Sequence, residues 1–151
     1  MKQERLIKGL AALLIGCSIN YFGDRLLGVK MELFYGLDTF SFSWMLDVFA
    51  LPFIVGLAVA VIFGMGGKWL SYFPPLIVRL MSYYAILHSG QPLPPDASLI
   101  PLGWWGFFVI LAIEASAFGG IMGEIVIRGT YGRSAPGTVY RKRGDDDEGD
   151  S

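Results

Sequence analysis

The sequence predicts an all-α polytopic membrane protein with four transmembrane helices, an interfacial outer segment and a disordered cytoplasmic tail. Of the 151 residues, 54% are hydrophobic and only 17% are charged, whereas about a quarter of the residues in a soluble domain are charged. Four apolar stretches approach the length of about 20 residues that a helix needs to cross a bilayer. We therefore expect a transmembrane domain over residues 1–128 and a charged, disordered tail over residues 129–151.

The first apolar stretch, residues 9–19, follows three basic residues. Residues 14–17 read Leu-Ile-Gly-Cys and match the bacterial lipobox, a signal at which the cysteine is lipidated and the preceding segment is removed. The apolar run continues past Cys17 to Phe22, which favours a retained first helix over cleavage. We therefore expect residues 1–16 to stay attached and the thiol to stay unmodified.

Residues 23–47 form a connection that is too polar to span a membrane and too apolar for a free loop. Its aromatic side chains between Phe34 and Trp44 favour a position at the membrane interface. Residues 25–37 are interpreted as helical, and residues 40–44, which alternate between aromatic and polar types, as a short extended piece.

The other three spans are predicted at residues 48–65, 73–90 and 104–127. The second and fourth spans each carry small residues at intervals of four. These two ridges consist of Gly56, Ala60, Gly64, Ala115, Gly119 and Gly123. Small residues let helix backbones approach closely, so we expect the ridges to pack together, either within one chain or between copies.

The basic residues favour an arrangement with both chain ends in the cytoplasm. Ten of the twelve Lys and Arg residues lie in the N-terminus, in residues 66–79 and after residue 127. Because cytoplasmic segments are enriched in Lys and Arg, we expect residues 23–47 and 91–103 outside. The predicted location is a bacterial plasma membrane.

Charged residues inside the apolar stretches are expensive in a membrane and need partners. Arg79 lies about 9 Å inside the start of the third span and Glu124 about 6 Å inside the end of the fourth. Antiparallel packing would bring them to one level, so we predict an ion pair. The same register places Glu114 near His88 and Tyr84. We favour the interpretation that these three residues form a hydrogen-bonded knot, meaning a neutral polar cluster that holds the helices together. The alternative is a proton relay.

Two acids, Asp24 and Asp47, flank the predicted outer connection. Neighbouring carboxyl groups can share a proton and act as general acid and base. The alternative, which we favour, is a pair of solvated acids at helix ends.

A single Cys and a single His exclude an intrachain disulfide and a Cys- or His-rich metal site. We expect no cofactor, metal or nucleic-acid partner; the expected partners are the lipid bilayer and other integral membrane subunits, or further copies of the chain. The leading hypothesis is an accessory or scaffold subunit of a membrane complex rather than an enzyme. The alternatives are a small transporter or channel component with Glu114 in the conduction path, and an outer-face enzyme using Asp24 and Asp47.

Overall fold

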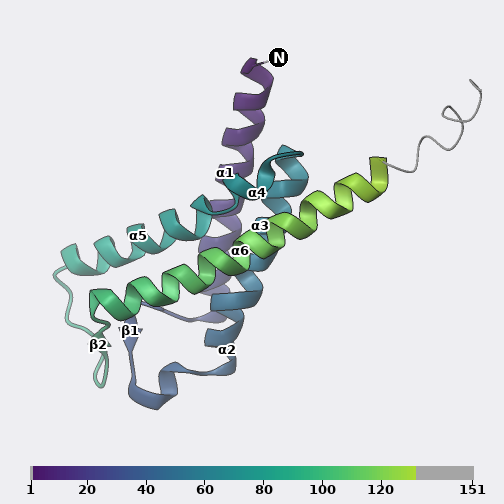
Figure 1. Cartoon of the computed structure of the whole chain (residues 1–151). Helices are drawn as coiled ribbons and strands as arrows, with labels where there is room; N and C mark the ends of the chain where they lie inside the picture. The colour runs from purple at the N-terminus through teal and green to yellow at the C-terminus, as the bar shows by residue number, and fades with distance from the viewer. Residues whose placement is uncertain (1, 132–151) are drawn as a thin grey trace, which may run out of the picture.

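The computed structural model describes residues 2–131, which form a helical bundle with one short β ladder (Figure 1). The helices are α1 (Lys2–Leu27), α2 (Phe42–Met45), α3 (Leu51–Phe63), α4 (Gly67–Leu70), α5 (Phe73–His88) and α6 (Leu102–Tyr131). Strands β1 (Leu33–Phe34) and β2 (Ser98–Leu99) pair antiparallel, with Leu33 opposite Leu99.

Within residues 2–131, four helical stretches are long and apolar enough to cross a membrane, which is the number that the sequence predicts. They are Lys2–Leu27, Phe42–Phe63, Gly67–His88 and Leu102–Thr130. The third begins at Gly67 rather than at residue 73, because Gly66 turns the chain at φ 94° and α4 starts at once. The predicted tail begins inside α6, and its residues 132–151 lie outside the described part of the chain.

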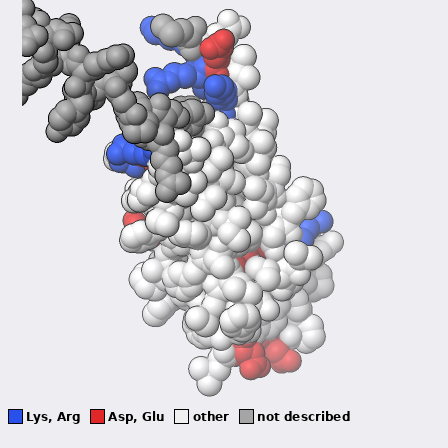
Figure 2. All heavy atoms as spheres, turned by 90° about the vertical axis from the view of Figure 1, so that its right-hand side faces the viewer, with Lys and Arg blue, Asp and Glu red and all other residues white. Residues whose placement is uncertain are grey.

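The four spans alternate in direction. At one end of the bundle, Phe63 and Leu70 lie beside Gly9, close to the start of α1. At the other end, Leu51 lies beside Gly23, and β1 joins β2. On the face of the molecule shown in Figure 2, basic side chains gather at the end of the bundle where α1 begins.

The second span contains a π-helical stretch, Leu46–Ala50, between α2 and α3. Here the Leu51 N–H donates to the Leu46 carbonyl, five residues earlier. Pro52 follows in the first turn of α3 and cannot donate a backbone hydrogen bond, and its ring would clash with the carbonyl four residues before it. The wider π-helical turn accommodates the proline inside a continuous helix. Asp47 is part of this π-helical stretch.

The ridges of small residues meet within one chain, where α3 crosses α6. A Cβ atom added to Gly56 would overlap the Ser116 carbonyl, and one added to Gly119 would overlap the Phe53 carbonyl. Ala60 similarly faces Gly123. Gly64 is not part of this contact, because it ends α3 with φ 89° and has no atom within 4 Å of an added Cβ. Ala115 is half-buried beside the contact.

The predicted interfacial segment has a different local structure from the one expected. The chain leaves α1 at Gly28, whose φ is 66°, and the Val29 N–H donates to the Asp24 carbonyl, as in a Schellman C-cap. Residues 25–37 are therefore not one helix. Residues 40–44 are not extended either, because Ser41 caps α2 by accepting from the Trp44 N–H.

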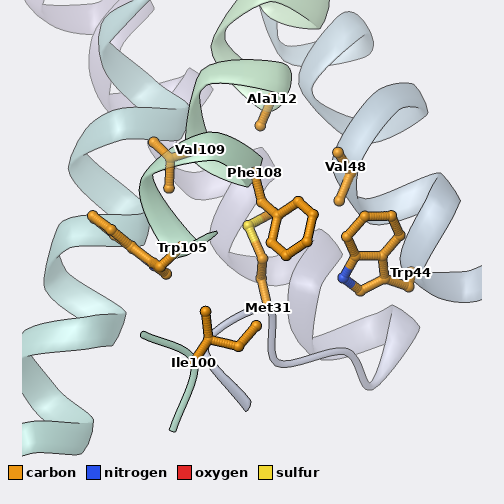
Figure 3. Packing of buried hydrophobic residues seen from close by; sticks show 8 residues of the cluster. All are labelled: Met31, Trp44, Val48, Ile100, Trp105, Phe108, Val109 and Ala112. Atoms are coloured by element: carbon orange, nitrogen blue, oxygen red, sulfur yellow. The ribbon is translucent and has the colours of Figure 1, made fainter. Parts of the chain in front are cut away.

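Part of this segment is buried in the largest hydrophobic core (Figure 3). That core consists of Met31, Trp44, Val48, Ile100, Trp105, Phe108, Val109 and Ala112. Trp44 meets Phe108 edge to face, with ring centroids 5.0 Å apart. Aromatic pairs in this geometry add to the stabilisation that burial of apolar area provides. Because the core contains residues from both connections and from α6, it holds residues 23–47 and 91–103 against that helix.

Candidate functional site: a buried arginine among three carboxylates

The most strongly charged buried site centres on Arg79 of α5, which is only 1% exposed. Its Nη2 lies 2.9 Å from Asp24 Oδ1 and 2.6 Å from Asp47 Oδ2. Its Nη1 lies 3.8 Å from Glu32 Oε1, which is an ion-pair contact but too long for a hydrogen bond. One guanidinium thus joins the last turn of α1, the π-helical stretch and the loop before β1. We call these four residues the Arg79 cluster.

The predicted ion pair between Arg79 and Glu124 is not formed. Because the third span starts at Gly67, Arg79 lies near the middle of that span instead of near its first end. Asp24 lies in the last turn of α1 and Asp47 in the π-helical stretch, and both are buried and hydrogen-bonded to Arg79 instead of facing solvent. The interpretation of Asp24 and Asp47 as solvated acids at helix ends is therefore wrong.

Glu124 has different partners at the far end of the bundle. Its Oε1 accepts hydrogen bonds from the Gly66 N–H at 2.9 Å and the Lys68 N–H at 3.2 Å. The turn between α3 and α4 leaves these amides without helical acceptors, so the carboxylate satisfies them. Glu124 therefore fastens α6 to this turn.

Glu32 has no hydrogen-bond partner for Oε1 within residues 2–131, although the residue is only 2% exposed. Burial raises the pKa of Glu32 above its usual value, and the nearby Arg79 guanidinium only partly offsets this effect. With three carboxylates around one guanidinium, the cluster lacks positive charge when all its members are ionised.

This shift predicts a pH dependence of stability. A carboxyl group with a raised pKa in the folded state stabilises the protein below the pKa of the unfolded chain, and that stabilisation is lost as pH rises through the folded value. Wild type should therefore lose stability relative to Glu32→Gln as pH rises above the ordinary glutamate range. Parallel unfolding titrations of both proteins in detergent, at several pH values, measure this. A constant difference would contradict the prediction.

The predicted cluster of Glu114, His88 and Tyr84 is only partly assembled. Tyr84 stacks on His88 with ring centroids 4.0 Å apart, and His88 Nδ1 lies 3.0 Å from the Tyr84 carbonyl oxygen. Both residues are exposed on α5. Glu114 is exposed on α6 and makes no hydrogen bond or ion pair with either residue in the described part of the chain. Neither the knot nor the relay is therefore present within one chain.

A groove of about 930 Å³ lies between α1 and α5, beside the Arg79 cluster. Its lining includes three members of the cluster, Asp24, Glu32 and Arg79. Most of the remaining lining consists of apolar side chains from the two helices, and Leu14 and Met81 among them are strongly exposed. The groove therefore opens toward the surroundings of the bundle.

The geometry favours a structural clamp at Arg79 over acid–base catalysis. Both aspartates accept a hydrogen bond from one guanidinium nitrogen, which holds the two carboxyl groups in fixed positions. Asp47 has no exposed surface through which substrate or water could reach it. Within residues 2–131, no group of three His, Cys, Asp or Glu side chains is arranged to hold a metal ion.

Sequence reasoning missed two members of this region, Glu32 and Asn20. Asn20 is fully buried one turn before Asp24, and neither polar atom of its side chain has a hydrogen-bond partner among the described residues. The signal was available, because small or polar residues recur every four positions along the buried face of α1. These residues are Ala12, Gly16, Asn20 and Asp24.

Comparison with known proteins adds no family: no family model, curated protein or solved structure matches this chain.

Proposed function

We propose that this protein is an integral membrane protein that serves as an accessory subunit of a larger membrane complex, and that it binds a partner helix through α6. The observation that carries the proposal is Glu114, an acidic residue exposed at the middle of a long apolar helix. It lies about 18 Å along α6 from Leu102, deep within the proposed span.

Glu114 belongs to an exposed stripe along α6. The other members are 45% to 63% exposed and recur at intervals of three or four residues, as one helix face requires. We call this the α6 stripe; it consists of Trp104, Phe107, Ile110, Glu114, Phe118, Ile121 and Ile125. Its apolar members suit lipid or a partner equally well, but its carboxyl group does not suit lipid.

A lone acidic side chain facing hydrocarbon costs roughly 2.5–3.5 kcal/mol at the centre of a span. A partner helix that presents a basic or hydrogen-bond-donating side chain at this depth would remove that cost. A parallel two-fold dimer through the stripe would instead place one carboxyl group opposite another. We therefore infer a different membrane subunit as the partner.

The transporter alternative would need a path between subunits, because Glu114 faces outward from the bundle of a single chain. The enzyme alternative would need access to Asp47, which is closed. Neither alternative has an observation in its favour comparable to the α6 stripe.

We further propose that both ends of the chain face the cytoplasm, as the distribution of Lys and Arg favours. Single cysteines at Lys30 and Asp96, in a Cys17→Ser background, should react with an impermeant thiol reagent in whole cells. A cysteine at Lys68 should react only after the membrane is opened. Labelling at Lys68 in intact cells would contradict this orientation.

The function is tested by purification from native membranes in mild detergent. A second integral membrane protein should co-purify with wild type at a fixed stoichiometry. The variants Glu114→Leu and Ile121→Trp should both purify without it. Leu80→Trp is the matched control, because Leu80 is 49% exposed on α5, away from the stripe. If both α6 variants keep the same partner, or if wild type purifies alone, the proposal fails.

A further inference from the structure

The groove between α1 and α5 combines three features that together describe one kind of ligand. It is mostly apolar, its lining includes the carboxyl groups of Asp24 and Glu32, and its lining also includes two exposed cations, Arg25 and Lys30. Its volume of about 930 Å³ lies in the range of small-molecule sites. We propose that it binds an aminophospholipid of the surrounding bilayer.

The carboxyl groups of the Arg79 cluster would bind the ammonium group of such a lipid. Asp24, Glu32 and Asp47 surround a single guanidinium, whereas the two other cations of the groove lining, Arg25 and Lys30, are exposed and make no ion pair with these acids among the described residues. Glu32 lines the groove, is only 2% exposed and leaves Oε1 without a hydrogen-bond donor among the described residues. A primary ammonium carries three N–H donors and can supply one here.

The two exposed cations would bind the phosphate of the headgroup. Arg25 and Lys30 line the groove close in sequence to Asp24 and Glu32. The Arg25 guanidinium lies 4.6 Å from the centre of the Tyr21 ring, which also lines the groove, so the aromatic ring orients it. A zwitterionic headgroup would thus meet carboxylates with its amine and cations with its phosphate.

The apolar lining along α1 and α5 would contact an acyl chain of the lipid. Along α1 the lining runs from Leu14 to Arg25, about 16 Å of helix. On α5 it runs from Ile77 to Ile86. Leu14, Phe22 and Met81 are 65% to 70% exposed at the sides of the groove, so a lipid could enter laterally from the bilayer. This site is independent of the α6 stripe.

Native mass spectrometry of the delipidated full chain tests the inference, with three phospholipids that share the same acyl chains and are added at equal concentration. Phosphatidylethanolamine should be retained roughly tenfold more than phosphatidylcholine, whose ammonium has no N–H, and than anionic phosphatidylglycerol. Glu32→Gln should reduce retention of phosphatidylethanolamine to the phosphatidylcholine level. Asp38→Asn, which changes an exposed acid in the same connection, should not.

A second variant keeps the test decisive if Glu32→Gln does not fold. Ala85 is exposed and lines the groove, so Ala85→Trp should fill it and lower retention while the bundle stays intact. Leu80→Trp, outside the groove lining, is its control. Equal retention of the three lipids, or unchanged retention in Ala85→Trp, would overturn the inference. Retention of phosphatidylethanolamine that is unchanged after Arg25 and Lys30 are both changed to Gln would support an amine site alone and overturn the aminophospholipid.

Discussion

Replacing Arg79 with glutamine is expected to destabilise the protein by about 3–5 kcal/mol, because the change leaves buried carboxylates without their cation. Arg79 is 1% exposed and Asp47 is fully buried, so solvent screens their interaction little. Reversible unfolding in mixed detergent micelles measures the change in free energy of unfolding. Arg25→Gln is the control, since that side chain is exposed, and its effect should stay within about 0.5 kcal/mol.

A double-mutant cycle then identifies the partner of Arg79. Asp47→Asn in the Arg79→Gln background should cost much less than in wild type, with a coupling energy on the order of 1–3 kcal/mol. The same cycle with Glu124→Gln should give coupling close to zero, because Arg79 and Glu124 share no hydrogen-bond or ion-pair partner among the described residues. Strong coupling to Glu124 and none to Asp47 would contradict the structure.

The second large effect is expected at the crossing of α3 and α6. Gly119→Ala places a methyl group against the Phe53 carbonyl, and because backbone cannot move aside as a flexible side chain can, the helices must separate. We expect a loss of about 1–3 kcal/mol, and more for Gly119→Val. The same detergent unfolding experiment measures it.

Gly106→Ala is the matched control on the same helix. Apart from the chain neighbours and the local helix backbone, no atom of the described residues lies within 4 Å of a Cβ added there, so only helix propensity changes. Alanine in a helix interior is favoured over glycine by about 0.5–1 kcal/mol, so this variant should be neutral or slightly more stable. Equal losses at residues 106 and 119 would show that close packing does not explain the glycine at the crossing.

The spans and the helix crossing could be predicted because they depend on local properties of the sequence. Long apolar runs predict helices of spanning length, and small residues at intervals of four predict where two backbones can approach. Gly56 and Gly119 show this, since each lies against the backbone of the other helix. Gly64 has the same spacing but ends its helix, and spacing alone cannot distinguish a contact residue from a C-cap.

The charged site could not be predicted because depth in a bundle depends on where each helix begins. Pro74 and Pro75 suggested that the third span starts at residue 73, where α5 does begin, but α4 precedes α5 and extends the candidate span back to Gly67. The six residues left out of the predicted span, about 1.7 turns of helix, moved Arg79 in the prediction from the level of Asp24 and Asp47 to the level of Glu124. Glu32 was missed for a different reason, since a loop residue has no periodic pattern that indicates its direction.

The proposal that a partner helix covers the α6 stripe is tested most directly by photo-crosslinking in living cells. A photoreactive phenylalanine analogue at Ile110 or Phe118, one turn on either side of Glu114, should capture one membrane protein of constant mass. The same analogue at Leu80 of α5 should not capture it, and Glu114→Leu should reduce capture at both α6 positions. Crosslinks to lipid alone from both α6 positions, or the same captured protein from Leu80, would contradict the proposal.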